Sequence, residues 1–229
     1  SLVAMRLSAM IHNELGLHVA TRDILTQPTL RQLAAISAEQ PESQQTLASN
    51  TLLDYYPLTE NQRGVYIDWE MNRESTQYNM PKLQVFQHLD AALLREALIK
   101  TVNAHPYLKT HFDMRDGDVV QLRLDNEPAE VTLTTLTEEP TIAFFQSKVH
   151  PFDLLHDHLY RLEIYQYGNK VWLLRDFHHI IFDGTSGFVF ANDVEAALKG
   201  LNLKQETYTA FDFALDEKAR MQSEQYQQA

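Results

Sequence analysis

The chain has 229 residues, of which 44% are hydrophobic and 22% charged, values typical of a globular protein with one large domain or a small and a medium one. Its net charge of −12 argues against a nucleic-acid groove, which needs clustered lysine and arginine, and the lack of cysteine excludes disulfides, thiolate metal sites and a cysteine nucleophile. No apolar run approaches the roughly 20 residues that span a bilayer, and no signal segment opens the sequence, so we expect no membrane contact and a cytoplasmic location.

The first part of the chain, residues 1–36, is expected to be helical. Apolar residues recur at helical spacing from Leu2 to Leu15, and Gly16 follows where a glycine commonly ends a helix. A second helix is expected after Pro28, a residue tolerated in a first helical turn. Two such helices bury little apolar surface alone, so they predict part of a small domain or an arm that leans on the rest.

A linker is expected to separate this segment from a larger domain. Residues 37–51 are polar, lack periodicity and contain Pro41, a composition typical of linkers. The larger domain is then expected to cover 52–229. Near its start, Thr59 is a good N-cap for a short helix.

Strands and helices alternate in the first part of the larger domain. Asp90 is a good N-cap, His105-Pro106 ends the helix that follows, and Asp116-Gly117 is a turn signal. The expected elements are a strand over 83–87, a helix over 91–103, strands over 107–112 and 119–124, and a helix over 137–148.

A second hairpin leads to two adjacent histidines. The runs 159–167 and 171–177 are joined at Gly168-Asn169, which predicts two antiparallel strands. His178 and His179 follow the second strand directly.

The residues after the histidines are expected to begin a helix near Asp183 or Thr185. Apolar residues then continue at helical spacing toward a glycine end signal at Gly200. The first N–H groups of such a helix would face the same space as an imidazole, so a base would lie beside partial positive charge.

The two histidines indicate acid-base chemistry or a buried core pair. Imidazole can accept a proton from an amine or hydroxyl nucleophile near neutral pH. Neighbours on a strand point to opposite faces, so His178 and His179 cannot both address one site, and one of them is expected to be structural. The divergence of the rings also argues against a metal site with Asp183. Asp183 would be costly to bury unpaired and is expected to meet an arginine or lysine.

The stretch His178-His179-x-x-x-Asp183-Gly184 resembles the HHxxxDG signature of the condensation domains of nonribosomal peptide synthetases, which belong to the chloramphenicol-acetyltransferase-like acyltransferases. Other short patterns agree with that family and follow the same order along the chain. They are Tyr56-Pro57-Leu58 with Gln62-Arg63, His105 to Phe112, Pro151 to Leu154 with Arg161, and Tyr208 with Phe211 to Ala214. The shared order argues against chance agreement.

One of these patterns departs from the family. In its RHExLRTxF motif, Ala104, Pro106 and Lys109 replace the first arginine, the glutamate and the second arginine. Family members pair a motif arginine with the aspartate of HHxxxDG, so the resemblance implies that Lys109 or Arg161 supplies the cation for Asp183, or that Asp183 is held in some other way.

Residues 1–36 resemble the C-terminal two-thirds of a peptidyl carrier protein. The resemblance is carried by Ser1 to Leu7, Leu15-Gly16-Leu17, Asp23-Ile24-Leu25 and Pro28-Thr29-Leu30. In that family the serine that opens this helix carries the 4′-phosphopantetheine arm, and Ser1 stands at its position. The glycine-rich turn that precedes this serine in the family would lie before residue 1.

For the fold, the condensation resemblance implies an α+β protein. Residues 52–229 would be the N-terminal half of a two-layer α/β sandwich of the chloramphenicol-acetyltransferase-like type, preceded by a small helical segment. The family's domain is a pseudo-dimer of two such halves with its site between them, so the half alone is expected to be inactive.

For function, the resemblance implies amide-bond formation between a donor acyl or peptidyl thioester and the amine of an acceptor aminoacyl thioester, both on carrier-protein phosphopantetheine arms. The second histidine of the signature is catalytic in that family, which here is His179. His178 and Asp183 would be supports, Gly184 would let the substrate approach the backbone, and no metal is needed. Expected partners are the donor and acceptor carrier proteins, the remaining half of the domain and neighbouring synthetase modules, without nucleic acid.

Three alternatives stay open. Epimerisation domains share HHxxxDG, so the same fold could invert an α-carbon. A free-standing acyltransferase that uses coenzyme A is disfavoured by the carrier-like segment. A catalytically silent carrier-docking module would agree with the replacements Ala104, Pro106 and Lys109.

Overall fold

The computed structural model describes residues 7, 10–11, 19, 21–27, 29–39, 53–206 and 208–222. The chain divides into two compact units, residues 1–47 and 48–229. Within the described ranges, every helix is too short or too polar to traverse a lipid bilayer.

In the first unit, the structure describes α2 (Thr21–Thr26) and α3 (Leu30–Glu39). Helix α3 confirms the helix expected after Pro28 but continues beyond residue 37, where the polar composition predicts the start of a linker. Alanine and glutamate are good helix formers, so the last residues of α3 can prolong the helix until the chain nears Pro41. Ser1 lies outside the described residues, as does most of the helix expected between Leu2 and Leu15.

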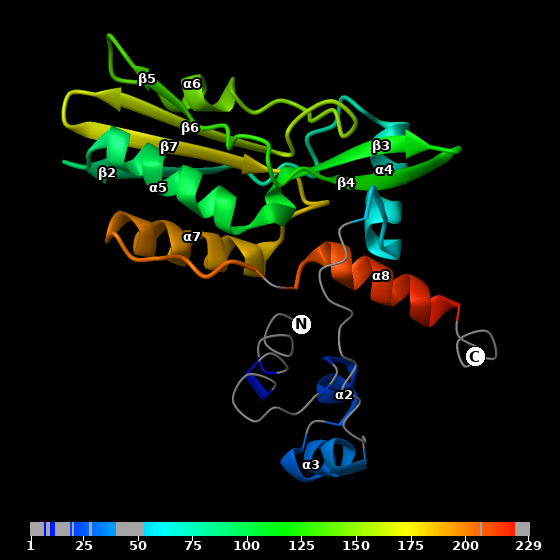
Figure 1. Cartoon of the computed structure of the whole chain (residues 1–229). Coiled ribbons are helices and arrows are strands. Elements are labelled where there is room, and N and C mark those ends of the chain that lie inside the picture. Colours follow the sequence, from blue (N-terminus) through cyan, green and yellow to red (C-terminus); the bar gives the residue numbers. More distant parts are fainter. Residues whose placement is uncertain are drawn as a thin grey trace. The chain divides into compact units, whose positions relative to one another are not determined.

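A four-stranded sheet forms the body of the second unit (Figure 1). Its strands, in spatial order, are β2 (Lys82–Gln87), β7 (Lys170–Phe177), β6 (Tyr160–Tyr167) and β5 (Thr132–Thr135). All neighbours pair antiparallel except β5, which runs parallel to β6. The β6–β7 hairpin confirms the pair of strands expected around Gly168-Asn169.

Helices cover both faces of this sheet. Helices α5 (Ala91–Ala104) and α7 (Gly184–Leu198) pack against each other on one face (Figure 1). On the other face, the short helix α6 (Ile142–Gln146) brings Phe145 against Tyr165 and Trp172. The main core lies on the α5 and α7 side and includes Leu94, Leu98, Leu162, Ile164, Val171, Leu173, Phe190 and Val194. This arrangement confirms the expected α/β sandwich, with α6 as a small cover on the second face.

A three-stranded sheet adjoins this body. Its strands, in spatial order, are β1 (Tyr56–Pro57), β4 (Asp118–Arg123) and β3 (Thr110–Arg115). Helices α4 (Glu60–Met71) and α8 (Ala210–Met221) lie near this sheet (Figure 1). Thr59 caps α4 and Asp90 caps α5, as the sequence predicts. Phe211 of α8 packs 4.7 Å from the Tyr56 ring, which holds α8 to β1.

Three details of the expected secondary structure are wrong. The strand expected over 107–112 begins only at Thr110, because the residues before it form the 3-10 helix η1 (Pro106–Lys109), which proline can start. The helix expected over 137–148 is only α6, since Pro140 interrupts its first turn. Strand β5 was not expected, because its four residues are too few to give a clear alternating pattern and mainly the β-branching of its threonines favours a strand.

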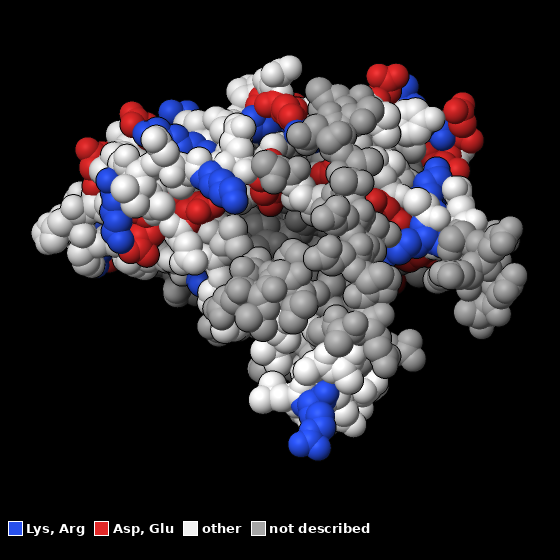
Figure 2. Space-filling view, turned by 60° about the horizontal axis from the view of Figure 1, so that its bottom comes forward, with Lys and Arg blue, Asp and Glu red and all other residues white. Residues whose placement is uncertain are grey.

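Acidic and basic side chains are interspersed over the described part of the face in Figure 2. Elsewhere in the described residues, Arg73 pairs with Glu70 and Arg123 pairs with Asp125, each at 2.7 Å.

Candidate active site

The β6–β7 hairpin carries the two histidines to the end of β7. His178 pairs with Asn79 as an isolated antiparallel bridge, just after the last residue of the strand. The backbone N–H of His178 donates to the carbonyl of Leu159 at 2.9 Å, and that of His179 donates to the carbonyl of Tyr78 at 2.8 Å. The segments before β2 and β6 therefore hold the backbone of the histidine pair from two sides.

His178 is the buried member of the pair, with 3% of its surface exposed. Its ring lies between Tyr78 and Phe152, at centroid distances of 5.8 and 5.7 Å, and its Nδ1 accepts a hydrogen bond from the backbone N–H of Ile180 at 3.2 Å. Burial, aided by His179 and Arg161, lowers the pKa of His178 to about 4. The ring is therefore neutral near pH 7, and its packing fits the structural role expected for one histidine of the pair.

His179 is exposed, in contrast to its neighbour. The two side chains therefore differ in exposure, and His179 lies in the turn that follows the strand. The loop that follows leads into α7, whose first residue is Gly184. A Cβ placed on Gly184 would meet no described atom within 4 Å, so there is open space beside the start of this helix.

Asp183 caps helix α7 and forms no ion pair with the described residues. Its Oδ1 accepts hydrogen bonds from the backbone N–H and the hydroxyl of Ser186, both at 2.7 Å. The expectation that a lysine or arginine meets this carboxylate is therefore wrong. The helix N–H groups and the helix dipole already stabilise a partly exposed N-cap carboxylate, so no cation is required.

The two cations proposed for Asp183 have other partners. Lys109 is buried, and its Nζ donates to the carbonyl of Asp125 at 3.1 Å. Arg161 lies on β6, on the face of the sheet opposite α7, and binds the segment before that strand. Lys109 and Arg161 therefore both make contacts other than an ion pair with Asp183.

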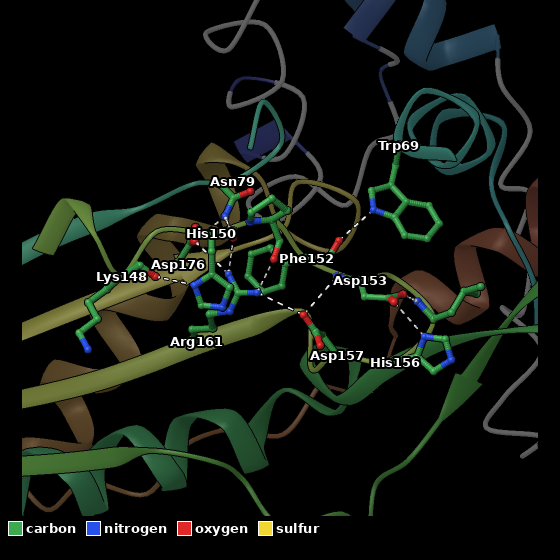
Figure 3. Close-up of polar contacts among 12 residues, drawn as sticks. Trp69, Asn79, Lys148, His150, Phe152, Asp153, His156, Asp157, Arg161 and Asp176 are labelled. Atoms are coloured by element: carbon green, nitrogen blue, oxygen red, sulfur yellow. Dashed lines mark hydrogen bonds and ion pairs between the residues drawn. The ribbon is translucent and has the colours of Figure 1, made fainter. Parts of the chain in front are cut away.

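Arg161 holds the segment before β6 in place (Figure 3). Its Nη1 donates to the carbonyl of His150 at 2.6 Å and its Nη2 donates to that of Pro151 at 2.7 Å. Its guanidinium also lies 3.7 Å from the centre of the Phe152 ring. Because Phe152 packs edge-on against His178, Arg161 supports His178 through one aromatic ring.

Asp176 is a buried carboxylate in the same network (Figure 3). Its Oδ2 accepts a hydrogen bond from Asn79 at 2.6 Å and lies 3.8 Å from Nη1 of Arg161. Burial raises the pKa of this carboxyl group, although Asn79 and Arg161 act in the opposite direction. Sequence reasoning missed Asp176 and Asn79. The hairpin register, which places Arg161 opposite Asp176, could have indicated the pair, whereas no local pattern marks Asn79.

Gln62 connects three of the family-like patterns. Its buried Nε2 lies 2.9 Å from Oε1 of Gln121 and 3.3 Å from the carbonyl of Ile180, and it also contacts the hydroxyl of Tyr107. Ile180 follows His179 directly. Buried hydrogen bonds therefore tie the loop after the histidines to the start of α4.

Two cavities lie near these elements in the described part of the chain. One, of about 310 Å³, lies between α7 and the sheet and is lined by Arg175, Phe190 and Glu195 among others. The other, of about 430 Å³, is lined by Trp69, Arg73 and the residues that follow Pro151. His179 lines neither of these two cavities.

Comparison with known proteins agrees with the family-like patterns. The family model described as "Condensation domain" matches residues 53–229, and the model described as "Phosphopantetheine attachment site" matches residues 1–36. Surfactin synthase subunit 2 of Bacillus subtilis (strain 168) is 32% identical over 219 residues, which cover 94% of this chain and 6% of that protein. The chain thus spans a small fraction of the length of this relative.

Solved structures show the same fold. The X-domain from teicoplanin biosynthesis superposes with a TM-score of 0.67 at 25% identity, over 80% of this chain and 42% of that chain. The starter condensation domain of rhizomide synthetase RzmA superposes with a TM-score of 0.66 at 18% identity, over 76% of this chain and 46% of that chain. The chain therefore belongs to the condensation-domain family, with a phosphopantetheine attachment segment ahead of its condensation domain.

Proposed function

We propose that the chain is part of a nonribosomal peptide synthetase whose condensation domain joins two carrier-bound substrates by an amide bond. The donor is an acyl or peptidyl thioester and the acceptor is an aminoacyl thioester, each on the phosphopantetheine arm of a carrier protein. Family membership supports this assignment, and the observation that carries it is the exposed ring of His179 beside the buried ring of His178.

His179 is the proposed acid-base residue. Its imidazole orients the acceptor amine and takes a proton from it as the nitrogen attacks the thioester carbonyl. The C–N bond forms, the C–S bond breaks, and the proton passes to the departing thiolate, which leaves as a free thiol. Neither a covalent enzyme intermediate nor a metal is needed for this step.

The neighbouring residues have supporting roles in this proposal. His178 fixes the end of β7 by its packing against Tyr78 and Phe152. Asp183 fixes the first turn of α7 through Ser186. Gly184 leaves room for a pantetheine arm beside that turn, because no described atom occupies the space a side chain would take.

The proposed active site needs the remaining half of the condensation domain. The solved chains of this fold extend well beyond the part that this chain matches, which is 42% of the X-domain chain and 46% of the RzmA chain. An exposed His179 gains a channel for two substrates only when other protein covers it. We therefore expect residues 1–229 alone to form no peptide, whereas the complete domain does.

The decisive experiment uses a complete synthetase module that contains this chain, with both carriers loaded, and measures the dipeptidyl thioester. His179→Ala is expected to lower the rate by about 10²-fold or more, since general acid-base catalysis supplies about 10²–10⁴-fold. The matched control is His156→Ala, which removes an exposed histidine bound to Asp153. Unchanged product formation with His179→Ala would refute the assignment.

Ser1 is the proposed attachment point of phosphopantetheine. It opens the segment that the attachment-site model matches, and it lies outside the described residues. The test is incubation with a phosphopantetheinyl transferase and coenzyme A, followed by intact-mass measurement. The protein should gain one arm, and Ser1→Ala should gain none. Modification of both proteins would place the arm on another residue.

A docking module is the second candidate. It is favoured by the similarity to the X-domain from teicoplanin biosynthesis, which has also been solved in a complex with OxyB. A docking module would bind its protein partner equally well with and without His179→Ala and would form no product in the complete module. The assay above therefore separates the two functions.

A further inference from the structure

His111, Glu127 and His158 come from three separate segments and meet at one point. Nε2 of His111 lies 3.3 Å from Nδ1 of His158 and 3.1 Å from Oε2 of Glu127. Nδ1 of His158 lies 3.7 Å from the same oxygen. In a tetrahedral zinc site with ligand bonds of about 2.0–2.2 Å, two ligand atoms stand about 3.3–3.6 Å apart. The three atoms thus lie close to the corners of one face of such a tetrahedron.

One polar atom of this cluster lacks a hydrogen bond, whereas the two imidazoles contact each other through Nε2 of His111 and Nδ1 of His158. Oε2 of Glu127 is buried and accepts no hydrogen bond from the described residues, although both rings are near it. A buried carboxylate oxygen without a hydrogen bond is costly, and a cation between the three atoms would remove that cost.

The surroundings of His158 resemble those of a metal-binding imidazole. Its second nitrogen, Nε2, lies 3.5 Å from Oε1 of Glu130. A carboxylate at that position favours the tautomer with the proton on Nε2, which leaves the lone pair of Nδ1 directed at the cluster. The backbone N–H of Glu130 donates to the hydroxyl of Tyr160 at 3.0 Å, and the Tyr160 ring lies 5.7 Å from the His158 ring.

We propose that His111, Glu127 and His158 form a binding site for a divalent transition-metal ion with the ligand preferences of Zn²⁺, with water in the fourth position. Two imidazole nitrogens and one carboxylate oxygen suit Zn²⁺, whereas Mg²⁺ and Ca²⁺ prefer all-oxygen sites. The chain has no cysteine, so no thiolate competes for the ion. The site is separate from the HHxxxDG signature.

A metal ion there would connect the two sheets of the second unit. His111 lies on β3 of the three-stranded sheet, and His158 precedes β6 of the four-stranded sheet. Glu127 lies in the connection between β4 and β5. The residue after His158, Leu159, accepts the backbone hydrogen bond of His178, so the ion would also stiffen the segment that holds the end of β7.

The test is a titration of tag-free, chelator-treated protein of residues 1–229 with ZnCl₂ at about pH 7.5 by isothermal calorimetry. One Zn²⁺ per chain should bind, and free Zn²⁺ at 100 times Kd should raise Tm by about 5–10 °C. Co²⁺ should give the visible absorption of a tetrahedral site, and MgCl₂ should have no effect. Affinity should fall steeply between about pH 7.5 and pH 5.5, because protons compete for the imidazoles.

The variants His111→Gln and His158→Gln should each weaken binding by at least about 10-fold. Glu127→Gln, which keeps the size of the side chain, serves if a histidine variant fails to fold by circular dichroism. The matched control is His156→Gln, an exposed histidine two residues from His158, which should bind like the parent. No saturable binding by the parent protein, or equal affinity in the cluster variants and the control, would overturn the proposal.

Discussion

The guanidinium of Arg161 lies over the ring of Phe152, 3.7 Å from its centre, and the Phe152 ring in turn packs edge-on against the ring of His178. The same guanidinium faces Asp176 across the β6–β7 hairpin. Residues outside the HHxxxDG signature therefore determine how firmly the signature is held.

Arg161→Met should lower the free energy of unfolding by about 3 kcal/mol, because it leaves the buried carboxylate of Asp176 without its cation. Urea unfolding of the chain measures the change. Arg73→Met, which breaks an exposed pair with Glu70, should cost less than about 1 kcal/mol. Adding Asp176→Asn to Arg161→Met should recover part of the loss. Equal small effects at Arg161 and Arg73 would show that the buried network contributes little.

The free energy of unfolding should fall in mildly acidic solution, because the buried ring of His178 resists protonation. Its folded-state pKa is about 4, whereas its ordinary value is 6.5. Above pH 6.5 the ring is neutral in both states, so the full stability is present. As the pH falls from 6.5 to 4, the unfolded chain takes up a proton that the folded chain refuses, and about 3 kcal/mol is lost from this residue.

The variant His178→Asn isolates this contribution, since asparagine does not titrate and its side-chain oxygen can accept the hydrogen bond from Ile180. The parent protein should lose more unfolding free energy between about pH 7 and about pH 4.5 than the variant does. Identical losses in both proteins would mean that His178 titrates normally in the folded state.

Asp183→Ala should cost about 1 kcal/mol, the usual effect of removing an N-cap, while Asp183→Asn should be nearly neutral because asparagine also caps. Chemical denaturation of the three proteins distinguishes the cap from an ion pair. If a cation paired with this carboxylate, the asparagine variant would be as unstable as the alanine variant. Thr59→Ala, at the cap of α4, is the matched control and should cost a similar amount.

Gly184→Ala should leave the fold intact and impair the proposed reaction. The added methyl group meets no described atom within 4 Å, and alanine is the better helix former, so unfolding free energy should not fall. In a complete module, however, the methyl group would intrude on the pantetheine arm and raise KM for the carrier-bound substrate. Unchanged kinetics would show that the arm does not pass beside the start of α7.

Local features of the second unit could be predicted from the sequence because they depend on near neighbours in the chain. Thr59 and Asp90 mark helix starts by their side-chain chemistry, and Gly168-Asn169 marks the turn between β6 and β7. The alternation of side chains along a strand likewise predicts that His178 and His179 diverge. Strand β5 escaped prediction, since its pairing with β6 depends on a segment distant in sequence.

By itself, the sequence determined the family-like signature, and through that resemblance it predicted the sandwich of helices on a sheet and one structural and one catalytic histidine. Only the tertiary structure decided which histidine is buried, because burial depends on the Tyr78 and Phe152 rings that meet His178. It also assigned Asp183 to a helix cap and Arg161 to Asp176, where the sequence predicted a pair between Asp183 and a cation. Such partnerships follow from strand register and from chain segments that fold together, and neither is encoded in the spacing of a short motif.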